Sequence, residues 1–208
     1  MFFFLSLGYS LSCSTCVSTT SSSCSGSSVV CPSGYSCGAA YSQSTSGGSV
    51  AAISYAKACT PTSQCSTSGS LSVMGGIKMK MVSACCTTDN CTPTLPSLPS
   101  DNSSYNQLVC RTCASADSTW CYTSDTIQCT GNENRCLLMT TKVTGSSSAS
   151  AALRGCATQS ICDIGSQSSS VDGLTSDVKF ICTSGSPTLR YSFYLPALIG
   201  LLLLKLLF

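Results

Sequence analysis

The chain has 208 residues, of which 43% are hydrophobic and 9% are charged, and it contains 18 cysteines and no histidine. Its formal net charge is +2, but Arg190 and Lys205 lie in the C-terminal segment, so the remaining eight basic residues balance the eight acidic ones. Such a chain has no basic field that would attract nucleic acid, and its cysteine content indicates a disulfide scaffold that folds outside the cytosol.

The first 12 residues resemble the end of a secretory signal peptide. An apolar run from Phe2 to Leu7 is followed by small residues, with Ser10 and Ser12 at the positions −3 and −1 of a cleavage before Cys13. The run is short and has no basic residues in front of it, so the natural signal can begin upstream of Met1. We expect residues 1–12 to be removed on export.

Two runs of cysteines with almost the same spacing follow. The residues between successive cysteines number 2, 7, 6, 5, 21, 5 and 19 from Cys13 to Cys85, and 2, 7, 7, 6, 19, 5 and 19 from Cys110 to Cys182. This internal repeat predicts two similar domains in tandem, residues 13–91 and 110–184. Domains of this size bury little apolar surface, so we expect disulfides rather than a large core to stabilise them.

The long gaps between the cysteines predict β-hairpins. In the first domain, residues 37–59 turn at Gly47-Gly48, and residues 70–84 turn at Gly75-Gly76, after which apolar side chains alternate with lysines. In the second domain, residues 137–153 turn at Gly145, and Asp172-Gly173 turns the last hairpin. Alternation with a period of two is typical of half-buried strands. No segment before the C-terminal tail predicts a helix of ten residues, so the expected fold class is all-β.

Residues 92–109, between the two runs, contain three prolines and several serines and predict a stiff, extended linker. We therefore expect the domains to be joined by this linker and not fused. Asn102, followed by two serines, is a predicted N-glycosylation site in this exposed segment. Asn90 also fits the acceptor pattern, but the cysteine that follows it makes its use less favourable.

Residues 185–208 resemble a glycosylphosphatidylinositol (GPI) anchor signal, which is removed when the lipid is attached. A small-residue triplet at 184–186 is followed by a polar spacer and an apolar tail, 193–208. A transmembrane helix is the alternative, but the tail is shorter than the ~20 residues needed and is interrupted by Pro196 and Lys205. We predict attachment at Ser184, with the neighbouring small residues as alternatives, because Pro187 is badly placed for attachment at Gly185.

Three features of the cysteine pattern are specific. They are the openings Cys13-x-x-Cys16 and Cys110-x-x-Cys113, the five-residue gaps before Cys65 and Cys162, and the closing segment from Cys85 to Cys91. Together they resemble the Ly-6/uPAR family, in particular its two-domain GPI-anchored type, and the resemblance implies two tandem three-finger domains. Urokinase receptor-like proteins and two-domain phospholipase inhibitors show the same pattern.

The resemblance also implies the disulfide pairing, which spacing alone leaves open because eight cysteines allow 105 connectivities. In the first domain the implied pairs are Cys13–Cys37, Cys16–Cys24, Cys31–Cys59, Cys65–Cys85 and Cys86–Cys91. In the second domain they are Cys110–Cys136, Cys113–Cys121, Cys129–Cys156 and Cys162–Cys182. The chain departs from the family at Thr92, where an asparagine is usual, and in the second domain, which has no final cysteine pair.

Several short strings resemble catalytic or metal-binding motifs, but each lacks a physical requirement. Residues 34–38 match the nucleophile elbow around Ser36, which needs a strand–turn–helix context and a histidine base. Ser54-x-x-Lys57 and Ser176-x-x-Lys179 match a serine-acylase string, yet on strands residues three apart point to opposite faces. The C-x-x-C pairs favour structural disulfides over redox chemistry or zinc in an exported protein. We expect no catalysis, no metal and no cofactor.

Trp120 and Tyr122, which flank Cys121, are the candidate partner-contact residues. The alternative, that their rings cover the disulfide, is equally open at this point. The resemblance implies a GPI-anchored receptor or adhesion protein outside the cell that binds a protein ligand through rigid domains. The alternative is a secreted binding protein similar to the phospholipase inhibitors.

Overall fold

The computed structural model describes residues 10–171 and 173–184. Most of the expected signal peptide, the turn residue Asp172 and the expected anchor signal therefore lie outside the described residues.

The first cysteine run folds into antiparallel hairpins. Its strands are β1 (Ser12–Ser18), β2 (Ser27–Val30), β3 (Tyr35–Ser46), β4 (Ser49–Pro61), β5 (Ser68–Val73) and β6 (Ile77–Cys86). Single 3₁₀ turns span Thr62–Gln64 and Met74–Gly76. The two predicted double-glycine turns are present, and all four glycines have positive φ, which other residues adopt only with strain. The hairpins expected at residues 37–59 and 70–84 are thus confirmed.

The second run repeats this arrangement. Its strands are β7 (Tyr105–Arg111), β8 (Cys113–Ser115), β9 (Thr126–Thr130), β10 (Arg135–Thr144), β11 (Ala149–Ala157), β12 (Ser166–Val171) and β13 (Leu174–Ser184), with a single helical turn, α1 (Gln159–Cys162). Strand β10 pairs with β13 along its whole length, from Arg135 opposite Ser184 to Thr144 opposite Thr175. Residues 105–109, which were assigned to the linker, lie in β7, so the second unit begins five residues earlier than expected.

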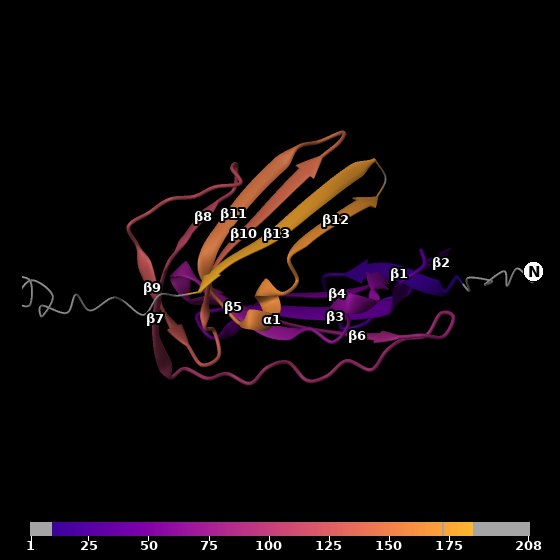
Figure 1. The fold of residues 1–208 in the computed structure, drawn as a ribbon, viewed down its shortest axis with the longest axis horizontal. Helices are drawn as coiled ribbons and strands as arrows, with labels where there is room; N and C mark the ends of the chain where they lie inside the picture. Colours follow the sequence, from indigo (N-terminus) through magenta and orange to yellow (C-terminus); the bar gives the residue numbers. More distant parts are fainter. Residues whose placement is uncertain (1–9, 172, 185–208) are drawn as a thin grey trace, which may run out of the picture.

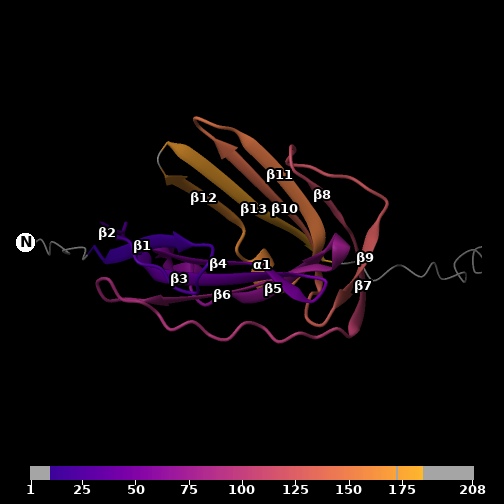
Figure 2. The ribbon, with the colours of Figure 1, turned by 180° about the vertical axis from the view of Figure 1, so that it is seen from behind.

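One sheet runs through both cysteine runs. Its strand order is β12-β13-β10-β11-β5-β6-β3-β4-β1-β2, with β8 paired to β11, while β7 and β9 form a separate two-stranded sheet. The junction is the antiparallel pairing of β5 with β11, which places Val73 opposite Gly155 and Leu71 opposite Ala157. From this junction the hairpins of the second run rise away from the first run (Figures 1 and 2).

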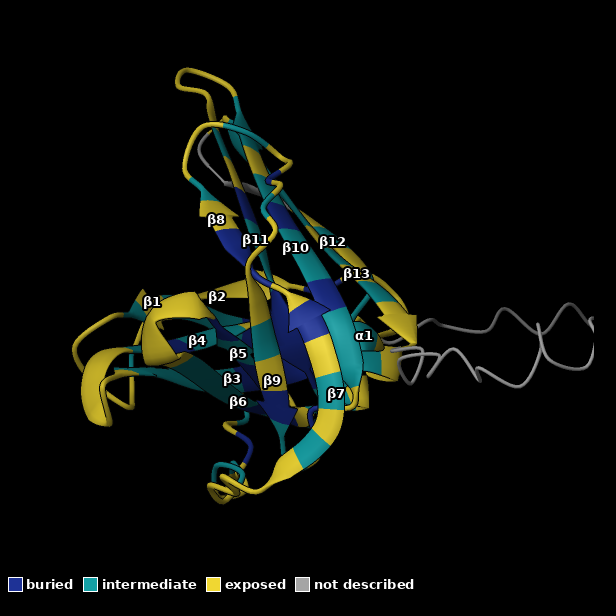
Figure 3. Cartoon of the chain, turned by 90° about the vertical axis from the view of Figure 1, so that its left-hand side faces the viewer, coloured by how far each residue is buried: buried dark blue, intermediate teal, exposed yellow. Residues whose placement is uncertain are grey.

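The aliphatic core lies at this junction. Leu71 and Val73 from the first run pack with Leu137, Ala157 and Ile161 from the second, and all five are buried. In Figure 3 the buried stretches gather around this junction, whereas the tips of the hairpins are exposed. The two units are therefore held together by more than the linker that was expected to join them, because β5 and β11 pair edge to edge and their apolar side chains pack in one cluster with Leu137 and Ile161.

Polar contacts reinforce the junction. Glu133, 1% exposed, accepts a hydrogen bond from the Ser70 hydroxyl at 2.7 Å, and its carboxylate lies 3.8 Å from the Lys78 ammonium. The Thr112 hydroxyl accepts a hydrogen bond from the Met74 amide and donates one to the Arg154 carbonyl. Buried polar groups need such partners, so these contacts favour one relative position of the two units.

The linker returns along the first unit and is held there by its one acidic residue. Asp101 lies 2.7 Å from the Lys80 ammonium and 3.7 Å from that of Lys78. The hydrogen bond from Lys80 is the main cause that lowers the pKa of Asp101 below its ordinary value of 3.8. The lysines predicted to alternate with apolar residues on β6 therefore face the linker, whereas Met79 and Met81 pack against the aliphatic core.

All eighteen cysteines are paired, in nine disulfides that coincide with the pairs implied by the resemblance. Two of them stack side by side in each unit, so that three sulfurs lie close together: those of Cys13, Cys31 and Cys59, and those of Cys110, Cys129 and Cys156. Among the described residues, three of the four buried apolar clusters are built on cysteines. Sulfur therefore takes the place of an aliphatic core inside each unit.

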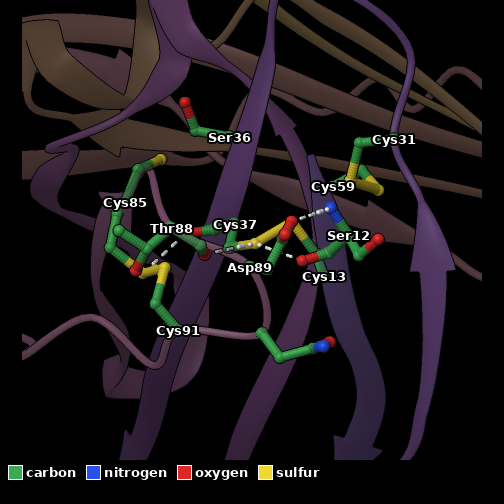
Figure 4. The surroundings of a disulfide bond; sticks show 12 residues. Ser12, Cys13, Cys31, Ser36, Cys37, Cys59, Cys85, Thr88, Asp89 and Cys91 are labelled. Carbon is green, nitrogen blue, oxygen red and sulfur yellow. Dashed lines mark hydrogen bonds between the residues drawn. A yellow bond between two sulfur atoms is a disulfide. The ribbon is translucent and has the colours of Figure 1, made fainter. Parts of the chain in front are cut away.

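The start of the first unit includes two residues that were assigned to the signal peptide. Leu11 is buried against Cys13 and Cys31, and its carbonyl accepts a hydrogen bond from the Cys31 amide. The Ser12 amide donates to the Asp89 carboxylate (Figure 4), and its carbonyl accepts from the Asn90 amide. These contacts favour a mature chain that retains Leu11 and Ser12, and they disfavour the expected cleavage before Cys13.

The closing loop of the first unit is fixed without the asparagine that is usual after its last cysteine. Besides the contacts to Ser12, the Asn90 side-chain oxygen accepts a hydrogen bond from the Ser28 hydroxyl at 2.6 Å. Thr92, which replaces the asparagine, accepts a hydrogen bond from the Lys57 ammonium at 2.9 Å. Asp89, Asn90 and Thr92 thus tie this loop to three different strands.

Candidate partner-binding surface

The connection between β8 and β9 carries the two aromatic residues singled out in the sequence, and it arches outside β8 before it returns (Figure 1). The Cys113–Cys121 disulfide closes it into a short loop. Hydroxyl groups organise its backbone, since Ser115 accepts from the Ser118 amide and Ser118 accepts from the Trp120 amide. The loop is thus ordered before any partner arrives.

Neither ring is buried over the disulfide. Cys113 and Cys121 pack instead against Ala152 and Leu138, whereas Trp120 is 57% exposed and Tyr122 is 74% exposed. Of the two interpretations left open by the sequence, the structure therefore disfavours the one in which the rings cover the disulfide. Large exposed aromatic side chains on a rigid loop are typical of the residues that dominate binding energy in interfaces.

An arginine lies over each ring. The guanidinium of Arg154, on β11, is 4.2 Å from the centre of the Trp120 ring, and that of Arg111, on β7, is 5.4 Å from the centre of the Tyr122 ring. Arg111 also donates a hydrogen bond to the Thr123 carbonyl at 2.8 Å. These cation–π contacts hold both the rings and the charged groups in place.

A hollow of ≈ 430 Å³ opens beside Trp120. Four strands and the β8–β9 loop contribute to its lining, which includes Leu138 from β10 and the Cys110–Cys136 disulfide. Val109 and Ile181 present partly exposed apolar side chains there, at 42% and 50% exposure. We call the following set the Trp120 surface: Val109, Arg111, Trp120, Tyr122, Arg154 and Ile181.

The sequence indicated the aromatic members of this surface but missed Arg111, Arg154, Val109 and Ile181. One signal for Arg154 was available. Arg154 is the only charged residue of β11. It lies on the same side of this strand as Ala152 and Cys156, which are both buried. A charged residue there indicates either a buried ion pair or a functional role.

The other predicted site residues lie apart from this surface. Asn102 is exposed in the linker, and its side-chain oxygen accepts a hydrogen bond from the Ser104 amide at 2.9 Å. Ser184 is exposed at the end of β13. In the part of the chain that the structure describes, no helix is long and apolar enough to cross a membrane.

The strings that resemble catalytic motifs lie on strands. Ser36 is buried on β3, where its hydroxyl is 3.3 Å from that of Thr62, and it is not at a turn that leads into a helix. Ser54 and Lys57 lie on β4, and Ser176 and Lys179 lie on β13. The required geometry of those motifs is therefore not formed by any of these residues.

The clustered cysteines do not form a metal or redox centre. Each member of the two sulfur clusters is in a disulfide and offers no thiolate, which is the form that binds zinc. In both C-x-x-C strings the two cysteines pair with other cysteines and not with each other, as a thioredoxin-like centre would require.

Comparison with known proteins places these observations in context. The family model described as the u-PAR/Ly-6 domain matches residues 9–94 and again residues 106–188. Among curated proteins, the phospholipase A2 inhibitor 25 kDa subunit of Naja kaouthia is 33% identical over 113 residues, which are 53% of this chain and 60% of that protein. The chain thus spans about three fifths of the length of this relative.

Among solved structures, the crystal structure of mouse TEX101 is similar over 82% of this chain and 97% of that one, with 17% sequence identity and a TM-score of 0.34.

Proposed function

Because the chain belongs to the u-PAR/Ly-6 domain family, we propose that it is an extracellular protein, held at the cell surface by a GPI anchor, that binds a protein ligand through the Trp120 surface. One observation carries the binding part of this proposal. Two exposed aromatic side chains of one loop, Trp120 and Tyr122, are fixed in place by two arginines beside a hollow with apolar walls. A surface that is already ordered loses little conformational entropy on binding.

The anchor part of the proposal rests on the C-terminal sequence together with the position of Ser184. This residue is exposed, and the order of small residues, polar spacer and apolar tail follows it directly. We also assign an N-linked glycan to Asn102. Its side chain is exposed, and the hydrogen bond from the Ser104 amide to its oxygen leaves the side-chain nitrogen available for the sugar.

Cells that express the full chain test the anchor. We expect phosphatidylinositol-specific phospholipase C to release the protein into the medium, with Ser184 as the last residue of its C-terminal peptide and a glycan on Asn102, both identified by mass spectrometry. Deleting residues 193–208 is the control and should give secretion without the enzyme. Protein that stays on treated cells, or that is free in the medium of untreated cells, would contradict the proposal.

The binding surface is tested by staining cells with labelled tetramers of the mature chain, residues 10–184. We expect Trp120→Ala to weaken staining about tenfold or more, as the loss of a central aromatic side chain does in other interfaces. Val17→Ala is the matched control, because Val17 is 71% exposed on β1 in the first unit. Trypsin treatment of the cells should abolish staining if the ligand is a protein. Equal staining by the two variants would exclude the Trp120 surface.

The second candidate function is that of a secreted inhibitor, and the similarity to the snake phospholipase A2 inhibitor subunit favours it. The same release experiment separates the two, since a secreted inhibitor would be found in the medium without enzyme treatment.

A further inference from the structure

Arg111 and Arg154 lack the carboxylate partners that Lys78 and Lys80 have. Lys78 and Lys80 lie within 4 Å of the Asp101 carboxylate. Among the described residues, no carboxylate lies at such a distance from Arg111 or Arg154. Two aspartates, Asp117 and Asp125, belong to the same loop, but neither carboxylate lies within 4 Å of a cation among the described residues. The Asp117 carboxylate accepts a hydrogen bond from the Ser115 hydroxyl instead.

Arg154 is also short of hydrogen-bond acceptors. Its Nε is buried and has no acceptor among the described residues, although the backbone carbonyl of the same residue is bound by Thr112. The guanidinium contacts the face of the Trp120 ring and lines the hollow. A guanidinium over an aromatic ring keeps the N–H groups at its edge free, and these groups match the two oxygens of a carboxylate.

The walls around these N–H groups are apolar. Val109, Leu138 and Ile181 line the hollow together with the indole. An apolar side chain of a ligand would therefore be buried beside the arginines, and the removal of water would strengthen any charge-assisted hydrogen bond next to it.

From this arrangement we infer the chemistry of the ligand: the Trp120 surface recognises an acidic segment of a partner protein, in which an Asp or Glu carboxylate binds Arg154, with Arg111 near it, and a neighbouring apolar side chain enters the hollow. This inference rests on the proposed binding function and adds the class of ligand to it.

A random 12-residue peptide library tests the inference, with the mature chain, residues 10–184, as the immobilised target. We expect the selected peptides to be enriched in Asp or Glu next to Leu, Ile, Met or Phe. For the best peptide, calorimetry should show that Arg154→Gln weakens binding about 10- to 100-fold, the usual effect of losing a hydrogen bond to a charged group. Replacing the peptide's acid by its amide should have the same effect, and the two changes together should add little.

Lys142→Gln is the matched control, because it removes one positive charge from an exposed position at the far end of β10 and should leave binding unchanged. Arg154→Lys should restore part of the affinity, since it keeps the charge but not the planar group. If Arg154→Gln fails to fold with its disulfides intact, Arg111→Gln provides the same comparison with a smaller expected loss.

The outcomes distinguish the inference from the proposed function. Selected peptides without acidic residues that still lose binding in Trp120→Ala would overturn the acidic ligand and keep the surface. Peptides that bind Trp120→Ala as well as the original chain, or a selection that enriches no peptide, would overturn both. Self-association of the chain that is lost in Arg154→Gln would assign the surface to a second copy and would also overturn the inference.

Discussion

Replacing Gly155 by alanine is expected to separate the two units of the molecule. A Cβ atom at this position of β11 would lie 2.1 Å from the Ser72 carbonyl oxygen and 2.9 Å from a methyl carbon of Val73. Backbone atoms of a paired strand cannot move aside without breaking the β5–β11 pairing, which is the only strand pairing between the units in the described part of the chain. We expect a loss of at least about 3 kcal/mol in the free energy of unfolding.

The readout should show separation and not general unfolding. Thermal unfolding should show one transition in the original chain and two in the variant, and the amides of Leu71 and Ala157 should lose protection from hydrogen exchange. The nine disulfides should still form, because none of them crosses the junction.

Two further variants are expected to lose less stability than Gly155→Ala. At Gly69 the three atoms nearest to an added Cβ would be side-chain atoms of Thr158, Ser160 and Ile161, at 2.5 to 2.8 Å, so Gly69→Ala should cost less. Ala151→Val adds atoms at an exposed position of β11 and should have almost no effect. A single unchanged transition in Gly155→Ala would mean that the junction does not hold the units together.

Removing the buried disulfide Cys129–Cys156 is expected to destabilise the second unit far more than removing Cys86–Cys91 destabilises the first. Both cysteines of the former pair are fully buried, the pair spans 27 residues, and the sulfur of Cys129 lies 3.4 Å from that of Cys110. The latter pair is half-buried and spans 5 residues. The larger loop gives about 3 to 4 kcal/mol of chain entropy against about 2 for the smaller one.

The buried pair carries an additional cost, because two alanines would leave a cavity among the stacked sulfurs. We therefore expect a total loss of about 4 to 6 kcal/mol for Cys129→Ala/Cys156→Ala and about 2 kcal/mol for Cys86→Ala/Cys91→Ala. Denaturant unfolding followed by hydrogen exchange in each unit measures both, and each double variant leaves an even number of cysteines. Equal losses would show that neither loop length nor burial determines the contribution of these bridges.

The strands could be predicted because their signals are local. Cysteine spacing, double-glycine turns and alternation on β6 are each contained in a few residues, and they gave the hairpins at the correct positions. The junction could not be predicted in this way. Leu71 and Val73 showed that one face of β5 is apolar, but what covers it is Leu137 and Ile161, which lie more than 60 residues further along the chain.

The same difference between local and long-range signals explains which residues of the candidate surface could be predicted. Trp120 and Tyr122 were found because two aromatic residues next to a cysteine stand out in any sequence. Arg154 was missed because its position beside Trp120 depends on the register of β8 against β11, in which it lies opposite Cys113. Such a register follows from the disulfides and the sheet as a whole, and no local pattern contains it.

The pairing of β13 with β10 also determines how the molecule carries a mechanical load. A pull along β13 from its C-terminal end is resisted by ten residue pairs at once, from Ser184 to Thr175, because hydrogen bonds that are sheared together must break together. If the pull instead peels the strand from its end, only Ser184 and Thr183 can detach before the tension reaches Cys182, which is bonded covalently to Cys162. Tension on this end of the chain therefore passes into a closed covalent loop after two residues.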